Sequence, residues 1–236
     1  MKLEVLPIEG MPEVHSGDDL VGLIIDAADR CDTPLLEHDC LVVTQKIVSK
    51  AEDRLVSVDA SEPLSHKPLV EAESVRVLRR RGDLVISETS QGFICANAGV
   101  DLSNVEKGYA ALLPEDPDRS ARRIRDGIKG KTGVEVAVVV SDTFGRPWRR
   151  GVTDVAIGSA GLNPVVDLRG TSDALGRELA VTEVAVVDEI AAAAELVMGK
   201  SAGVPVAIVR GLNRDWFGTG SVVEDVVRSP TEDLFR

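Results

Sequence analysis

The densest group of side chains that could do chemistry is the stretch 141–150, directly after an apolar, valine-rich run at 134–140. Such a run predicts a buried strand, and ligands often bind where a buried strand ends. Asp142 and Thr143 carry the hard oxygen atoms that Mg²⁺ and Mn²⁺ prefer. The alternative is that they cap a helix near Pro147. Guanidinium groups for phosphate or carboxylate follow at Arg146, Arg149 and Arg150.

A pair of lysines follows a second apolar run, at 40–44. Lys46 and Lys50 are four residues apart, so a helix starting near Gln45 would put both ammonium groups on one face. Paired cations suit a polyphosphate. A solvated helix face is the alternative interpretation.

The stretch 95–104 combines small residues with Asp101 and Asn104. Small residues let the backbone approach a ligand closely. Asp101 and Asn104 are three residues apart, so both could face one site from a turn or a first helical turn. An ordinary polar turn would have the same composition.

Two other charged groups are less specific. The segment 118–126 contains four arginines, which is typical of an exposed helix face with acidic neighbours. The segment 167–177 is a charged turn of uncertain role. Taken together, carboxylates for a metal, lysines for phosphate and arginines for anions favour phosphoryl transfer, in which the protein positions groups and neutralises charge.

A P-loop is not expected. Two Gly-Lys-Thr/Ser triplets occur, at 130–132 and 199–201. A P-loop needs another glycine five positions before the triplet, and those positions hold Arg125 and Ala194. A bound nucleotide must therefore use a different cradle.

Hydrophobic periodicity indicates alternating strands and helices without a regular βαβ rhythm, so the expected fold class is α/β or mixed α+β. No repeat or linker divides the chain, and one domain over 1–236 is expected. The expected strands are 2–7, 40–44, 83–88, 93–96, 134–140, 155–157, 165–168 and 205–209, and the expected helices are 17–31, 69–80, 118–130 and 178–198.

Composition limits the class of protein. The 236 residues carry a formal net charge of −12, which argues against nonspecific binding to nucleic acid or anionic membranes. The three cysteines form no CxxC motif, as expected of a reduced cytoplasmic protein. No run of 18 apolar residues and no signal-peptide pattern occurs, so a cytoplasmic location is expected.

Several long motifs, in order along nearly the whole chain, resemble the coenzyme F420-0:L-glutamate ligase family, which also forms the N-terminal part of some fused proteins. They are GMPEVHSGDDL, VVTQKIVSKAEDR, GFICANAGVDLSNV, LLPEDPDRSARRIR, VVVSDTFGRPWRRGVTDVAIGSAGL and VPVAIVRG. The resemblance implies a mixed α/β fold of two lobes, peculiar to the family, and an interlocked homodimer.

The same resemblance implies the reaction. L-Glutamate would be added to the phospholactyl-deazaflavin F420-0 or its dehydro precursor, with γ-linked additions afterwards. GTP would be hydrolysed to GDP and phosphate with Mg²⁺ or Mn²⁺ and K⁺, through an acyl phosphate.

Matched motif by motif, the resemblance assigns catalytic roles to Asp101 and Asp142, and the metal site to these two residues with Thr143. The residues it implies for GTP, together with Lys46 from the residue argument, are Met11, Pro12, Glu13, Val14, Gln45, Lys46, Lys50 and Asn104. It also implies an oxygen-bearing side chain for a second metal in the loop 198–205, where this sequence has the cation Lys200.

Two other function classes fit the residues alone. A metal-dependent phosphohydrolase or nucleotidyltransferase would consume nucleotide without glutamate. A nucleotide- or flavin-binding module would bind its ligand without turnover.

Overall fold

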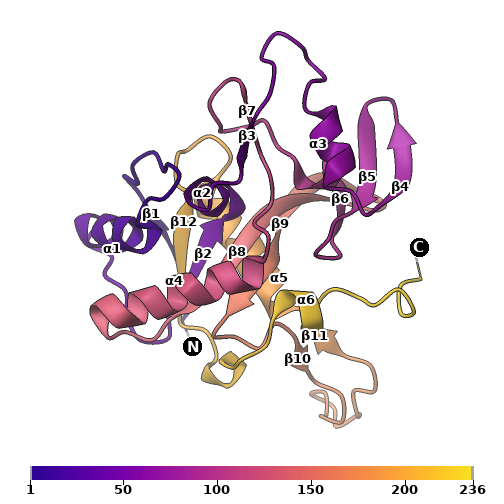
Figure 1. The fold of residues 1–236 in the computed structure, drawn as a ribbon. Coiled ribbons are helices and arrows are strands. Elements are labelled where there is room, and N and C mark those ends of the chain that lie inside the picture. The colour runs from indigo at the N-terminus through magenta and orange to yellow at the C-terminus, as the bar shows by residue number, and fades with distance from the viewer. Residues whose placement is uncertain (1, 235–236) are drawn as a thin grey trace.

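The computed structural model describes residues 2–234 and has a five-stranded sheet at its centre (Figure 1). Across the sheet the strands are β1 (Glu4–Ile8), β12 (Val206–Arg210), β2 (Cys40–Thr44), β8 (Ala137–Arg146) and β9 (Arg149–Ala160). Three smaller sheets and several helices complete the described chain. The predicted mixed α/β fold class is confirmed.

Helices cover both faces of this sheet, which explains why its central strands are apolar throughout. In Figure 1, α1 (Leu20–Arg30) and α4 (Pro117–Thr132) lie in front of the sheet and α5 (Val186–Met198) lies behind it. A strand buried on both faces reads as a continuous hydrophobic run. The main core accordingly contains Leu41, Val42 and Val43 of β2 and Val138, Val139 and Val140 of β8, all fully buried.

Strand direction brings four chain segments to one edge of the sheet. β2 and β8 run parallel and pair Thr44 with Ser141. β2 ends there, and β8 continues beyond this edge only in its hairpin with β9. β12 is antiparallel to β2 and begins at this edge, and β1, antiparallel to β12, ends there with Ile8 opposite Val206. The segments at this edge are 9–14, 44–50, 141–146 and 199–205.

A second group of elements lies above that edge in Figure 1. It has its own small core of Val70, Val85, Val100, Ala110 and Leu112. Its elements are β3 (Leu55–Ser57), α3 (Lys67–Ala72), β4 (Arg76–Arg81), β5 (Leu84–Glu88), β6 (Ile94–Ala96), a 3₁₀ turn (Asn97–Gly99) and β7 (Tyr109–Ala111). α2 (Gln45–Ala51) starts directly after β2 and leads into this group.

Two expected helices are shorter than their sequence pattern. The helix expected at 69–80 ends at Ala72, and β4 follows because Arg76–Arg81 pairs with β5 around a turn at Gly82. The helix expected at 178–198 begins only at Val186. Before it the chain forms an arm in which β10 (Val166–Asp167) pairs with β11 (Glu183–Val184). In both cases strand pairing prevails over local helix preference.

The strand expected at 134–140 lies further along the chain. β8 begins at Ala137 and continues to Arg146, because its second half forms a hairpin with β9. The remaining elements include the 3₁₀ turn Arg214–Trp216 and α6 (Val222–Asp225). Within residues 2–234, every helix is too short or too polar to cross a membrane.

A buried ion pair fixes the start of β2 to the end of β12. The carboxylate of Asp39 is 1% exposed and accepts hydrogen bonds from Nε and Nη2 of Arg210, each at 2.8 Å. It also accepts from the Leu36 amide, and Arg210 donates to the Pro34 carbonyl. The hydrogen bonds to Asp39 raise the pKa of Arg210, so the guanidinium stays charged at all ordinary pH values.

Replacing Arg210 with methionine should leave Asp39 as a buried charge without its partner. We expect the free energy of unfolding to fall by about 3–5 kcal/mol. Denaturant titration followed by circular dichroism measures it. The matched control is Lys131→Met, which removes a pair with the largely exposed Asp19 and should cost about 0–1 kcal/mol. Equally small losses of unfolding free energy in the two variants would contradict a stabilising role for the Asp39–Arg210 pair.

Candidate active site

A large cavity of about 1170 Å³ opens at the sheet edge where the four segments meet. The loop 101–106 of the second group of elements closes its other side. This volume is enough for a nucleotide-sized ligand. The cavity is lined by all the residues that the sequence analysis assigned to catalysis, the metal or GTP, namely Met11, Pro12, Glu13, Val14, Gln45, Lys46, Lys50, Asp101, Asn104, Asp142 and Thr143.

Asp101 is held by a lysine from the opposite wall. Its Oδ2 lies 2.5 Å from Nζ of Lys46, and both carboxylate oxygens also accept bonds from Ser103. Burial raises the pKa of Asp101, but Lys46 and Ser103 outweigh burial and leave that pKa below its usual value. The lowered pKa favours the ionised carboxylate, which is the form that binds cations.

Asp142 has the opposite character. Burial raises its pKa to about 7, and the nearby charges of Asp101 and Asp154 add to this effect. The Thr143 amide and the Lys46 ammonium oppose it only in part. Carboxylates that crowd together in this way are typical of sites that bind a cation, since the cation removes their repulsion.

Asp142 and Thr143 lie within β8, so the alternative of a helix cap is wrong.

Asp154 is a site residue that the sequence analysis missed. It lies opposite Thr143 in the β8–β9 pair and its side chain is 2% exposed. It accepts hydrogen bonds from Oγ1 of Thr143 at 2.6 Å and from Oγ of Ser141 at 3.1 Å. The only sequence signal is a single aspartate inside the run VTDVAIG, and its partners become visible only in the β8–β9 register.

Helix α2 presents both lysines to the cavity from one face, as their spacing predicts. Nζ of Lys50 is buried and pairs with the carboxylate of Glu13, which belongs to the loop after β1. The side-chain amide of Gln45 donates to Oγ of Ser49 at 2.7 Å and to the Leu112 carbonyl at 3.0 Å. Gln45 thus has a clear structural role, because it fixes α2 to the second group of elements.

Asn104 closes the cavity from above. It has a left-handed backbone with φ of 53°, and its Nδ2 lies 3.4 Å from the carbonyl oxygen of Lys200. This contact joins the loop after β6 to the loop before β12. Both the nucleotide role expected of Asn104 and the polar-turn alternative are compatible with this position.

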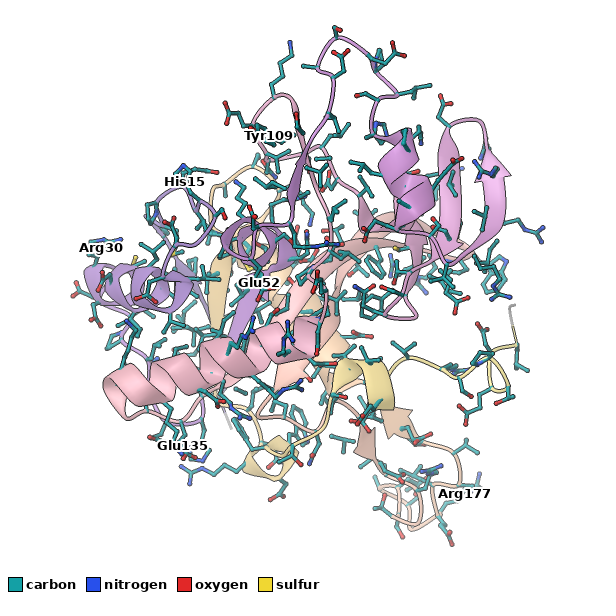
Figure 2. The ribbon with its side chains drawn as sticks, in the orientation of Figure 1. His15, Arg30, Glu52, Tyr109, Glu135 and Arg177 are labelled. Carbon is teal, nitrogen blue, oxygen red and sulfur yellow. The ribbon has the colours of Figure 1, made fainter. Side chains whose placement is uncertain are left out.

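The other charged segments lie outside the cavity. Three arginines of α4, Arg122, Arg123 and Arg125, pair with Asp116, Glu52 and Asp126, and Arg119 is exposed, so the interpretation as a solvated helix face is confirmed. Arg169 pairs with Asp167 and Glu183 on the arm. In Figure 2, Arg177 lies far out on this arm and Glu52 lies near α2. The exposed residues Arg146, Arg149 and Arg150 are at the β8–β9 turn, next to the cavity residues Gly145 and Val152.

The cavity has an unbalanced charge. Among residues 2–234, three ammonium groups line it, those of Lys46, Lys50 and Lys200, and six carboxylates face them, those of Glu13, Asp101, Glu106, Asp142, Asp154 and Glu195. An anionic ligand such as a nucleotide would be repelled unless cations enter with it.

Comparison with known proteins agrees with the resemblance seen in the motifs. Residues 10–211 match the family F420-0:gamma-glutamyl ligase. A protein of Methanothermobacter thermautotrophicus named coenzyme F420:L-glutamate ligase is 44% identical, with 100% of both chains covered. Proteins of the same name from Methanopyrus kandleri and Haloarcula marismortui are 42% and 40% identical, covering 100% and 99% of this chain and 98% and 96% of their own lengths. The chain therefore belongs to the F420-0:gamma-glutamyl ligase family, a family of enzymes.

Proposed function

We propose that this enzyme joins L-glutamate to a carboxylate of F420-0 or its dehydro precursor and uses GTP as the energy source. The observation that carries the proposal is one cavity in which crowded carboxylates and lysines from four sheet-edge segments meet, in a chain of this family. Such a cavity suits phosphoryl transfer, where the protein positions groups and offsets charge. Further γ-linked glutamates, K⁺, a homodimer and a cytoplasmic location are parts of the same proposal.

The donor atoms fit a divalent ion that shares its ligands with the nucleotide. Within residues 2–234, histidine, cysteine and acidic side chains form no group of three that could hold a metal ion by themselves. Mg²⁺ commonly uses one or two carboxylates and takes its other ligands from phosphates and water. The ligands that the protein contributes could be Asp101, Asp142 and Thr143. A bound ion would polarise the phosphate oxygens and offset their charge.

The proposed chemistry has two steps. The acceptor carboxylate attacks the γ-phosphorus of GTP, and GDP leaves with the bridging oxygen. The uncharged amine of glutamate then attacks the acyl carbon. Phosphate leaves with the oxygen that came from the carboxylate and takes up the proton that the nitrogen loses. Lys46 and Lys50 would hold the phosphates, and Lys50 is kept in place by its pair with Glu13. Arg146, Arg149 and Arg150, which are exposed at the β8–β9 turn, would bind the anionic acceptor near the cavity rim.

Incubation with GTP, L-glutamate, Mn²⁺ and F420-0 tests the activity. Mass spectrometry should detect products heavier by whole glutamate residues, formed only with GTP, together with equal amounts of GDP and phosphate. GTP hydrolysis without glutamate addition would favour the phosphohydrolase. Pyrophosphate release would favour the nucleotidyltransferase, and binding without turnover would favour the binding module.

Asp142→Asn should reduce the rate of glutamate addition more than 100-fold, because the neutral amide cannot supply a charged oxygen to the cation. The fold should persist, since the change removes a carboxylate that its neighbours repel. Rate and melting temperature are measured together. Asp126→Asn, on the exposed face of α4, is the matched control and should keep the normal rate. A near-normal rate for Asp142→Asn would remove Asp142 from the proposed site.

The pKa of about 7 for Asp142 predicts a pH dependence of metal binding. Below this pH the carboxyl is protonated, and a proton must leave before a cation can bind. The apparent affinity for Mn²⁺ alone should therefore fall by about tenfold between pH 8 and pH 6. Electron paramagnetic resonance of free Mn²⁺ measures it. The dependence should disappear in Asp142→Asn, and an unchanged slope in that variant would assign the proton to another group.

A further inference from the structure

Lys200 contacts three oxygen atoms of the hard kind that divalent metal ions bind. Its Nζ lies 2.9 Å from Oδ1 of Asp154 and 3.1 Å from Oε1 of Glu195, and it also contacts Oγ1 of Thr143. Two carboxylates and a hydroxyl are hard oxygen ligands, as Mg²⁺, Mn²⁺ and Ca²⁺ require. Here the positive charge at their centre belongs to the chain itself.

The fold holds the ammonium at this position from several directions. Asp154 is fixed on β9 by Ser141 and Thr143 of β8. Glu195 lies in the last turn of α5, and the helix ends at Gly199, one residue before Lys200. The carbonyl oxygen of Lys200 is contacted by Asn104 from across the cavity. The main chain on both sides of the lysine is therefore tied to the site.

Burial makes a cation at this point necessary. The Asp154 side chain is 2% exposed, and a buried carboxylate without a compensating charge is strongly destabilising. An ammonium is a compact point charge, and it can satisfy several oxygens at once. The Lys200 side chain is about half-exposed, and it lines the cavity.

We propose that Lys200 is a built-in cation that replaces a bound metal ion at the Thr143–Asp154–Glu195 oxygen set. Divalent ions would then bind only on the Asp101–Asp142 side of the cavity. This inference rests on the proposed use of a divalent ion in the cavity, but it concerns the number and place of the ions and not the reaction. Lys200 would make the positive charge next to the phosphates permanent and independent of the metal concentration.

The test counts the Mn²⁺ ions bound at saturation by the whole protein, with Mn²⁺ alone as the probe. The wild-type protein should bind one ion. Lys200→Met removes the charge and should bind two. Lys200→Arg keeps the charge and should bind one, which separates loss of charge from loss of the lysine shape. Lys131→Met, the exposed control, should also bind one.

Two further readouts locate the second ion without any activity measurement. Lys200→Met should melt at a lower temperature than the wild type in metal-free buffer, and Mn²⁺ should raise its melting temperature more than that of the wild type. Adding Glu195→Gln to Lys200→Met should lower the affinity for the second ion at least tenfold and leave the affinity for the first ion unchanged. A variant that failed to fold without metal but folded with Mn²⁺ would support the same conclusion.

The outcomes separate this inference from the proposed function. Two ions in the wild type, or equal numbers in the wild type and Lys200→Met, would overturn the role of Lys200 and leave the ligase proposal intact. No ion in the wild type and one in Lys200→Met would support the built-in cation and contradict the proposed site at Asp101 and Asp142.

Discussion

The parallel pairing of β2 with β8 is the constraint on which the site depends. Because both strands point the same way with Thr44 opposite Ser141, one edge carries both the start of α2 and Asp142 of β8. The antiparallel neighbours β12 and β1 bring two more loops to the same edge. A slip of one residue would exchange the two faces of a strand and separate Lys46 from Asp142.

The meeting of these strand ends at one edge also has an electrostatic consequence. Aligned strand ends concentrate carboxylates that would repel one another. Burial is the main cause of the raised pKa of Asp142, and the charges of Asp101 and Asp154 add to it. The protein reduces the repulsion with lysines taken from different elements, Lys46 on Asp101 and Lys200 on Asp154. The excess of acidic groups that remains requires further cations before a polyphosphate can bind.

The smaller group of elements has a mainly positioning role. Its core is separate, yet it meets the main sheet through α2, where Gln45 and Ser49 both bond to the Leu112 carbonyl. Leu112 follows β7, whose last residue Ala111 pairs with Asp101 across a β-bridge. This chain of contacts sets the distance between Asp101 and Lys46, so a loop far along the sequence is held rigidly against the sheet edge.

The sequence by itself determined the elements with strong local signals and the residue types at the strand ends. The buried valine runs, the amphipathic α4 and the polar residues after each strand can all be read locally, because periodicity and caps act within a few residues. Only the tertiary structure decided which ends meet. Lys46 and Asp101 are 55 residues apart, and Lys200 and Asp154 are 46 apart. For the same reason the sequence did not reveal the role of Asp154, or the strand pairing of β4 and of the arm at 166–184. Strand pairing and buried charge depend on partners that are distant in the sequence.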